Sequence, residues 1–171
     1  MRVLGIDPGL NISGYGILER LNGEIEVIEA GILRTDERQS MDKRLVELGR
    51  ELGIVIQQFK PDAMAIEELY SHYKHPRTAI IMGHARGLIL YKAAEASIEV
   101  VSYASTRIKK ALTGNGRASK EQMQKAIQTH MGLNTLPEPP DVADALAVAY
   151  CHIQAIVRDF TTSIKRKKIA V

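Results

Sequence analysis

Apolar and polar residues are distributed along the chain in patterns that predict five strands and five helices. Short apolar runs bounded by turn residues predict the strands. Asn22 and Gly23 separate two of these runs, and this pair is typical of a two-residue hairpin because both residues tolerate positive φ. The predicted strands are Arg2 to Asp7, Ser13 to Glu19, Glu24 to Arg34, Asp62 to Glu67 and Ile98 to Ser102.

Apolar residues that recur every three to four positions predict the helices. Ser40 is a residue type favoured at a helix N-cap, and Pro61 marks the end of the helix that follows it. Ser119 and Gln122 have the spacing of a capping box. The other predicted helices are Pro76 to about Ala96, Ser105 to Leu112, Lys120 to Met131 and Asp141 to about Val157.

The order of these elements predicts an α/β fold with a mixed five-stranded sheet. The hairpin makes the first three strands antiparallel. The two later strands arrive through helical crossovers, which favours parallel pairing with the first strand and places helices on both faces. By length, we expect residues 1–157 to form one domain. Residues 158–171, which include Lys165, Arg166, Lys167 and Lys168, are expected to form a basic, flexible C-terminal tail.

Composition excludes several classes of protein. The chain has 171 residues, one cysteine and a net charge of +3, and no apolar run approaches the about 20 residues that cross a bilayer. A single cysteine, Cys151, forms no internal disulfide. We therefore expect a cytoplasmic protein without a membrane segment or a disulfide framework.

Four carboxylates are the candidates for chemistry. Asp7 and Glu67 each end an apolar strand, and parallel neighbours place such residues at the same edge of a sheet. Asp141 and Asp144 are three residues apart and share one face of the last predicted helix, close to its N-terminus. Each acid alone has a commoner structural explanation, as a turn residue or a helix cap. Together the four predict a site for hard divalent cations, two of which, about 4 Å apart, can hydrolyse a phosphodiester.

The segments around these acids resemble the RuvC family of Holliday junction resolvases, which have an RNase H-like fold. Each segment alone is weakly specific, whereas all of them in this order and spacing are strongly specific. They are Gly5-Ile6-Asp7-Pro8-Gly9 with Ser13-Gly14-Tyr15-Gly16, Ala65-Ile66-Glu67-Glu68, Gly83-His84-Ala85-Arg86-Gly87, and Asp141-Val142-Ala143-Asp144-Ala145-Leu146-Ala147.

This resemblance implies that the catalytic, metal-binding acids are Asp7, Glu67, Asp141 and Asp144, although the third acid is Asp or His within that family. It implies hydrolysis with two Mg²⁺ ions per active site, replaceable by Mn²⁺, that leaves 5′-phosphate and 3′-hydroxyl ends. It also implies a homodimer that makes paired symmetric cuts across four-way junction DNA in recombination and DNA repair. The implied partner is a branch-migration motor complex of the RuvA and RuvB type.

Further residues acquire roles from the resemblance, each beside a simpler structural explanation. Tyr70 is expected to stack on bases near the junction centre, or else to be a partly buried loop aromatic. Gly83 and Gly87 indicate close contact, either at the dimer interface or with the protein's own sheet. Candidate contacts to DNA phosphates, each otherwise a solvated surface cation, are Lys109 and Lys120, with less support for Lys74, Arg77, Lys110 and Arg117.

Other functions are weighed against junction cleavage. A ribonuclease of the same fold that processes ribosomal RNA precursors shares a similar first strand and is the main alternative. An actin-like ATP-binding protein needs two lobes, for which 171 residues leave no room, and no P-loop is present. A DNA-binding module without catalysis has no reason to direct four acids at a phosphate, because uncompensated carboxylates repel it.

Overall fold

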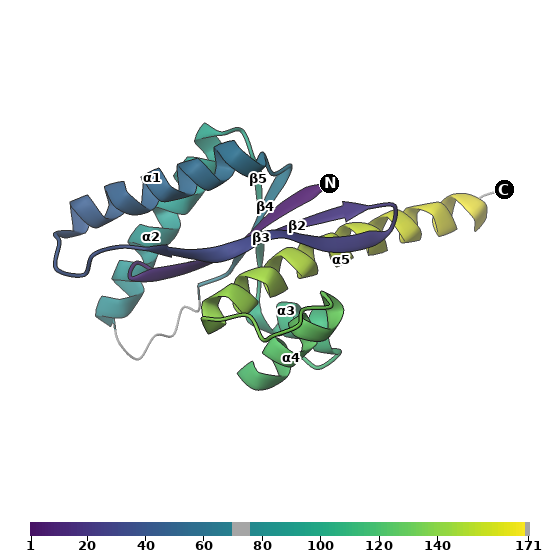
Figure 1. Ribbon diagram of the computed structural model, residues 1–171. Helices are drawn as coiled ribbons and strands as arrows, with labels where there is room; N and C mark the ends of the chain where they lie inside the picture. The colour runs from purple at the N-terminus through teal and green to yellow at the C-terminus, as the bar shows by residue number, and fades with distance from the viewer. Residues whose placement is uncertain (70–75, 170–171) are drawn as a thin grey trace.

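The computed structural model describes residues 1–69 and 76–169. It contains the predicted sequence of strands and helices, with ends shifted by a few residues (Figure 1). The strands are β1 (Arg2–Asp7), β2 (Ile12–Leu21), β3 (Glu24–Arg34), β4 (Ala63–Glu67) and β5 (Glu99–Tyr103). The helices are α1 (Met41–Phe59), α2 (Pro76–Glu95), α3 (Ser105–Thr113), α4 (Lys120–His130) and α5 (Pro140–Ile169).

The strands form one mixed sheet in the order β3-β2-β1-β4-β5. β1, β2 and β3 pair antiparallel, and β4 joins β1 and β5 in parallel, which confirms the predicted topology. Asn22 and Gly23 both have positive φ, 54° and 96°, as the predicted hairpin requires. The sheet therefore brings the C-terminal ends of β1 and β4 together, although 60 residues separate Asp7 from Glu67.

Two apolar layers hold helices on opposite faces of the sheet (Figure 1). Alternating residues of β1 decide the layers: Leu4 and Ile6 pack with α1 and α2, whereas Val3 packs with α3, α4 and α5. Helices on both faces were predicted from the two crossovers. The two layers bury residues 3–6 of β1, so the half-buried acid at its end is carried by a strand packed on both faces.

Helix α5 lies unusually close to the sheet because small residues line the face beneath it. A Cβ atom built on Gly5 would lie 2.1 Å from the Ala145 carbonyl oxygen. A Cβ on Gly16 would lie 2.6 Å from a methyl group of Leu146. The close approach of α5 therefore requires glycine at these two positions of the sheet. This contact sets the position of the N-terminal turns of α5.

Two details differ from the sequence prediction. Helix α5 continues to Ile169, beyond the predicted boundary at residue 157, through the segment expected to be a tail. Residues 158–169 contain neither glycine nor proline and are rich in lysine and arginine, which favour helix. Ser40 occupies the N-cap of α1, but its side chain makes no capping hydrogen bond and instead contacts the Asp42 carboxyl group. Across residues 1–69 and 76–169, no helix combines the length and apolar character needed to cross a membrane.

Candidate active site

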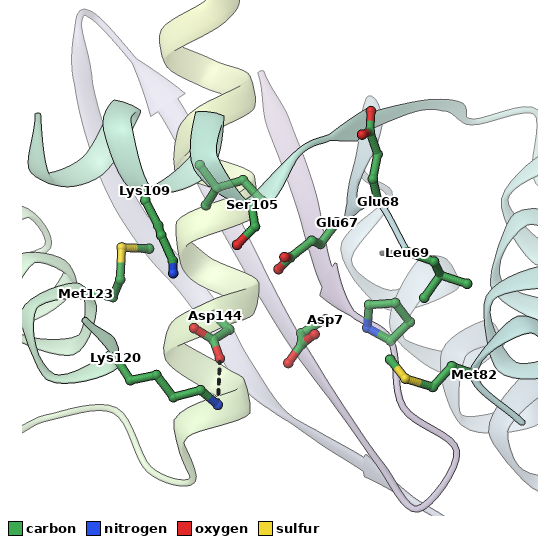
Figure 2. Close-up of a pocket in the computed structure, with 12 residues that line it drawn as sticks. Asp7, Glu67, Glu68, Leu69, Met82, Ser105, Lys109, Lys120, Met123 and Asp144 are labelled. Carbon is green, nitrogen blue, oxygen red and sulfur yellow. Dashed lines mark ion pairs between the residues drawn. The ribbon is translucent and has the colours of Figure 1, made fainter. Parts of the chain in front are cut away.

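Three carboxylates from three different elements lie around one pocket, which Glu68 also lines with its carboxylate directed away from them (Figure 2). Asp7 ends β1, Glu67 ends β4 and Asp144 lies in the second turn of α5. All three line a pocket of about 270 Å³, and Figure 2 shows their side chains around one common space. The parallel pairing of β1 and β4 and the close approach of α5 bring these residues together.

Asp141 lies beside this group rather than in the pocket wall. It occupies the first turn of α5, where its backbone lies directly above Gly14 of β2. Gly14 is the residue opposite Asp7 in the β1–β2 pairing. The negative charge of Asp141 is close enough to raise the pKa of both Asp7 and Asp144. The four predicted acids thus form one electrostatic cluster, of which three members line the pocket.

Asp7 is the most perturbed acid of the cluster. Burial raises the pKa of its carboxyl group from 3.8 to about 7, with further increases from Asp144, Glu67 and Asp141. The positive charge of Lys120 opposes these effects. Removing a carboxylate from water and surrounding it with other carboxylates both penalise its charged form. Asp7 is therefore a group that gains strongly from a cation in the pocket.

Glu67 and Asp144 are perturbed in the same direction, but each has a compensating partner. Burial raises the pKa of both groups. The Ser105 hydroxyl group donates a hydrogen bond to the Glu67 carboxylate and lowers its pKa. The positive charge of Lys120 lowers the pKa of Asp144, because the Lys120 Nζ atom lies 3.9 Å from Oδ2 of that carboxylate.

Two lysines stand on one side of the pocket. Lys109 comes from α3 and Lys120 from the first turn of α4, and both line the pocket beside Asp144 (Figure 2). The Ser119 and Gln122 capping box, confirmed in full, fixes the start of α4 next to Lys120. A pocket with acids at its base and cations at its side suits a phosphate group bound through divalent ions.

Ser105 and the apolar wall of the pocket are not among the site residues predicted from the sequence. The pattern around Ser105 predicts only the start of a helix, and the signal available for the site was its position two residues after the end of a strand. Met82 of α2 and Met123 of α4 close the pocket from opposite sides (Figure 2). Their sequence pattern is that of ordinary helix residues, so nothing in it marked them for the site.

The other predicted residues lie away from the pocket or outside the described chain. Arg77 and Arg117 are exposed and do not line the pocket. Tyr70 and Lys74 lie outside the described residues. Gly83 and Gly87 are exposed on α2, and a Cβ atom on either would have no neighbour within 4 Å among residues 1–69 and 76–169. Packing of these two glycines against the protein's own sheet is therefore excluded.

The donor set fits divalent cations by its chemistry. Asp7, Glu67, Asp144 and the adjacent Asp141 supply oxygen ligands of the kind that Mg²⁺ and Mn²⁺ bind. Within residues 1–69 and 76–169, no three His, Cys, Asp or Glu side chains already stand close enough together to hold an ion. The pKa values of Asp7, Glu67 and Asp144 are raised because ionising these groups in the pocket is unfavourable. A bound cation would offset this electrostatic penalty.

Known proteins resemble this chain over almost its whole length. A sequence model of the family described as "Crossover junction endodeoxyribonuclease RuvC" matches residues 3–152. The protein of that name from Rhodopirellula baltica is 46% identical over 149 residues, which cover 87% of this chain and 84% of the relative. The one from Caldicellulosiruptor saccharolyticus is 46% identical over 154 residues, covering 90% of this chain and 92% of the relative.

Solved structures agree with the sequence relatives. The Thermus thermophilus RuvC structure in complex with a Holliday junction substrate superimposes with a TM-score of 0.86 at 30% identity, covering 91% of this chain and 94% of that chain. The yeast mitochondrial Holliday junction resolvase shares the fold, with a TM-score of 0.67 at 14% identity over 96% of this chain and 83% of that chain. These neighbours confirm the predicted RNase H-like fold.

The matched region contains all four predicted acids as well as Ser105, Lys109 and Lys120. The relatives reported above are named for crossover junctions and give no support to the alternative of a ribonuclease for ribosomal RNA precursors. A family match across residues 3–152, joined to this identity and this superposition, means that the chain belongs to the RuvC family of crossover junction endodeoxyribonucleases.

Proposed function

We propose that this protein is a structure-selective DNA endonuclease that resolves Holliday junctions in homologous recombination and DNA repair. The observation that carries the proposal is the convergence of Asp7, Glu67 and Asp144 on one pocket, with Asp141 beside them. The family relatives support the junction as substrate, because one solved neighbour holds a Holliday junction. Hydrolysis of one phosphodiester in each of two opposite strands resolves the junction and leaves 5′-phosphate and 3′-hydroxyl ends.

Asp7, Glu67, Asp141 and Asp144 are the residues that would hold the catalytic metal, which we propose to be two Mg²⁺ ions, with Mn²⁺ as a substitute. Such ions, when bound, lower the pKa of a water nucleophile and stabilise the leaving oxygen. The chain's own residues prepare this chemistry. Ser105 holds the Glu67 carboxylate through a hydrogen bond.

The lysines complete the site on the DNA side. Lys109 and Lys120 line the pocket beside the acids, and we propose that they bind the oxygens of the scissile phosphate. The Lys120 Nζ atom also pairs with the Asp144 carboxylate across 3.9 Å. Arg77, Arg117 and Tyr70 stay proposals as DNA contacts, the first two to phosphates and the third by stacking.

Lys120→Ala is expected to lower the single-turnover cleavage rate by about 10–100-fold, because it removes a cation that supports Asp144 and the phosphate. Lys125→Ala is the matched control on the same helix, since the Lys125 side chain pairs with Glu121 on the exposed face of α4. Rates on a labelled junction, measured with each variant in excess, compare the two. Equal cleavage rates for both variants would show that the Lys120 side chain does not contribute to cleavage.

A homodimer is the proposed assembly, because paired cuts need two active sites. Helix α2 carries an exposed strip with helical spacing that fits a helix–helix contact: Ile80, Gly83, Gly87, Leu90 and Tyr91. Ile80 is 61% exposed and Tyr91 is 60% exposed, so this strip offers apolar surface that a helix–helix contact would bury. A branch-migration motor of the RuvA and RuvB type is the further partner that we propose.

Ile80→Glu is expected to weaken the dimer at least about tenfold, because each subunit would bury an unpaired charge in the contact. Leu21→Glu is the control, since Leu21 is 65% exposed at the β2–β3 hairpin, on a different part of the surface. Sedimentation velocity over a range of concentrations measures both. A variant Ile80→Glu that dimerises as the wild type does would exclude this face of α2.

The test of the function is cleavage of a labelled four-way junction beside a linear duplex of the same sequence and an RNA–DNA hybrid. Each substrate is incubated with Mg²⁺ and, separately, with EDTA. Symmetric nicks on the junction alone, absent with EDTA, are the expected result. Cleavage of the hybrid would instead identify a ribonuclease of the same fold, and junction binding without cleavage in several sequence contexts would contradict the proposed enzyme.

A further inference from the structure

Arg86 joins the end of the Glu67 strand to its neighbour. Its guanidinium group donates one hydrogen bond to the Glu67 carbonyl oxygen and a second, 2.7 Å long, to Ser102 Oγ. Glu67 is the last residue of β4, and Ser102 lies in β5, the parallel neighbour. One planar side chain from α2 therefore holds two strand ends at the edge of the site, as the fixed fork of an arginine allows.

The Glu67 carbonyl group lies at the C-terminal end of β4. The amide of Glu68 still donates to the Tyr103 carbonyl oxygen at 2.9 Å, but β4 goes no further. A half-buried carbonyl at such an end needs a donor. Arg86 provides it from the helix side, so the backbone of Glu67 is held by β5 on one side and by α2 on the other.

The same helix also contributes directly to the pocket. Met82 lies one turn before Arg86 on α2 and lines the pocket opposite the lysines. Arg86 itself does not line the pocket. Burial lowers the pKa of the Arg86 guanidinium group, and the charge of Glu68 opposes this effect. The arginine is thus a partly buried link between α2 and the backbone of a site acid.

We infer that Arg86 is a positioning residue that fixes the direction of the Glu67 carboxylate by holding the Glu67 backbone. The inference rests on the proposed function for its effect on cleavage, but its structural part is independent of activity. Ser102 is the second anchor of the guanidinium group. A lysine at position 86 keeps the charge but cannot span both acceptors in the same way.

The experiment compares Arg86→Ala and Arg86→Lys with Arg50→Lys, a control on the exposed surface of α1 where the arginine pairs with Glu51. Single-turnover cleavage per bound junction is expected to fall by about 10–100-fold in Arg86→Ala and by less in Arg86→Lys. Junction affinity in EDTA is expected to stay within about threefold of the wild type. Free guanidinium ion, far below denaturing concentrations, is expected to restore part of the rate of Arg86→Ala.

Stoichiometric junction binding counts the folded protein in each preparation. The inference would be overturned if the cleavage rate of the Arg86 variants did not fall. It would also be overturned if the fall only matched the fraction of protein that cannot bind the junction. Hydrogen–deuterium exchange gives a readout that needs no activity, because the Glu68 amide should exchange faster in both Arg86 variants and not in Arg50→Lys. If the wild type cuts no junction, the proposed function fails, and unchanged exchange at Glu68 would by itself refute the positioning role.

Discussion

Asp7→Asn is expected to abolish junction cleavage while junction binding persists or improves. The substitution removes one charged oxygen ligand at the centre of the acid cluster, where three other carboxylates act on it. Loss of residues that merely support metal ligands costs about 10–100-fold, so loss of a ligand should cost more. Binding improves because less negative charge faces the DNA phosphate. Cleavage assays with Mg²⁺ and gel-shift titrations in EDTA measure the two effects separately.

Asp42→Asn is the matched control, because Asp42 is an exposed aspartate in the first turn of α1. It should cut at the wild-type rate. Normal cleavage by Asp7→Asn, even with weaker binding, would show that the cluster is not the metal site.

The same variant also changes the dependence of stability on pH in EDTA. The Asp7 pKa is about 7 in the folded protein and 3.8 ordinarily, so the folded state disfavours the ionised group. The wild type therefore loses stability as pH rises from about 4 to about 7, and the loss is complete above that range. Asparagine has no such loss. Asp7→Asn should be more stable by roughly 2–4 kcal/mol at pH 8, and the gain should vanish near pH 4 in urea unfolding experiments.

Gly14→Ala is expected to damage both stability and cleavage. The added Cβ atom would lie 2.0 Å from the Asp141 carbonyl oxygen, and no side-chain rotation can relieve a clash with backbone. Either β2 or the first turn of α5 has to move, at a typical cost of about 1–3 kcal/mol. Because α5 carries both Asp141 and Asp144, a displacement of about 1 Å can lower the rate by about 100-fold.

Gly53→Ala tests whether any glycine replacement has this effect. A Cβ atom there would lie 3.5 Å from Cε of Lys92, which is an ordinary contact, and alanine favours helix by about 1 kcal/mol. Urea unfolding and single-turnover cleavage, both run well below the unfolding temperature, compare the two variants. If Gly14→Ala keeps the wild-type rate, the close approach of α5 does not set the geometry of the acids.

The fold, and the placement of two strand-end acids at one edge of the sheet, could be predicted because they depend on local patterns. Period-two alternation puts Val3, Gly5 and Asp7 on one face of a strand, and the helical crossovers favour parallel pairing of β4 with β1, which the structure confirms. Those two facts are enough to place Asp7 and Glu67 at one edge. The extent of α5 was missed because solvated basic residues resemble a tail, although the segment lacks any residue that stops a helix.

Spacing and residue type predict the sheet, the two layers of helices and the candidate acids, because these features depend on local patterns. The contacts between groups follow from the tertiary structure alone. The hydrogen bond from Ser105 to Glu67, the 3.9 Å pair of Lys120 and Asp144, and the contact of Gly14 with Asp141 join elements far apart in the chain. Such contacts depend on how closely a helix approaches a sheet and on which way each side chain turns, and neither has a period that can be recognised along the chain.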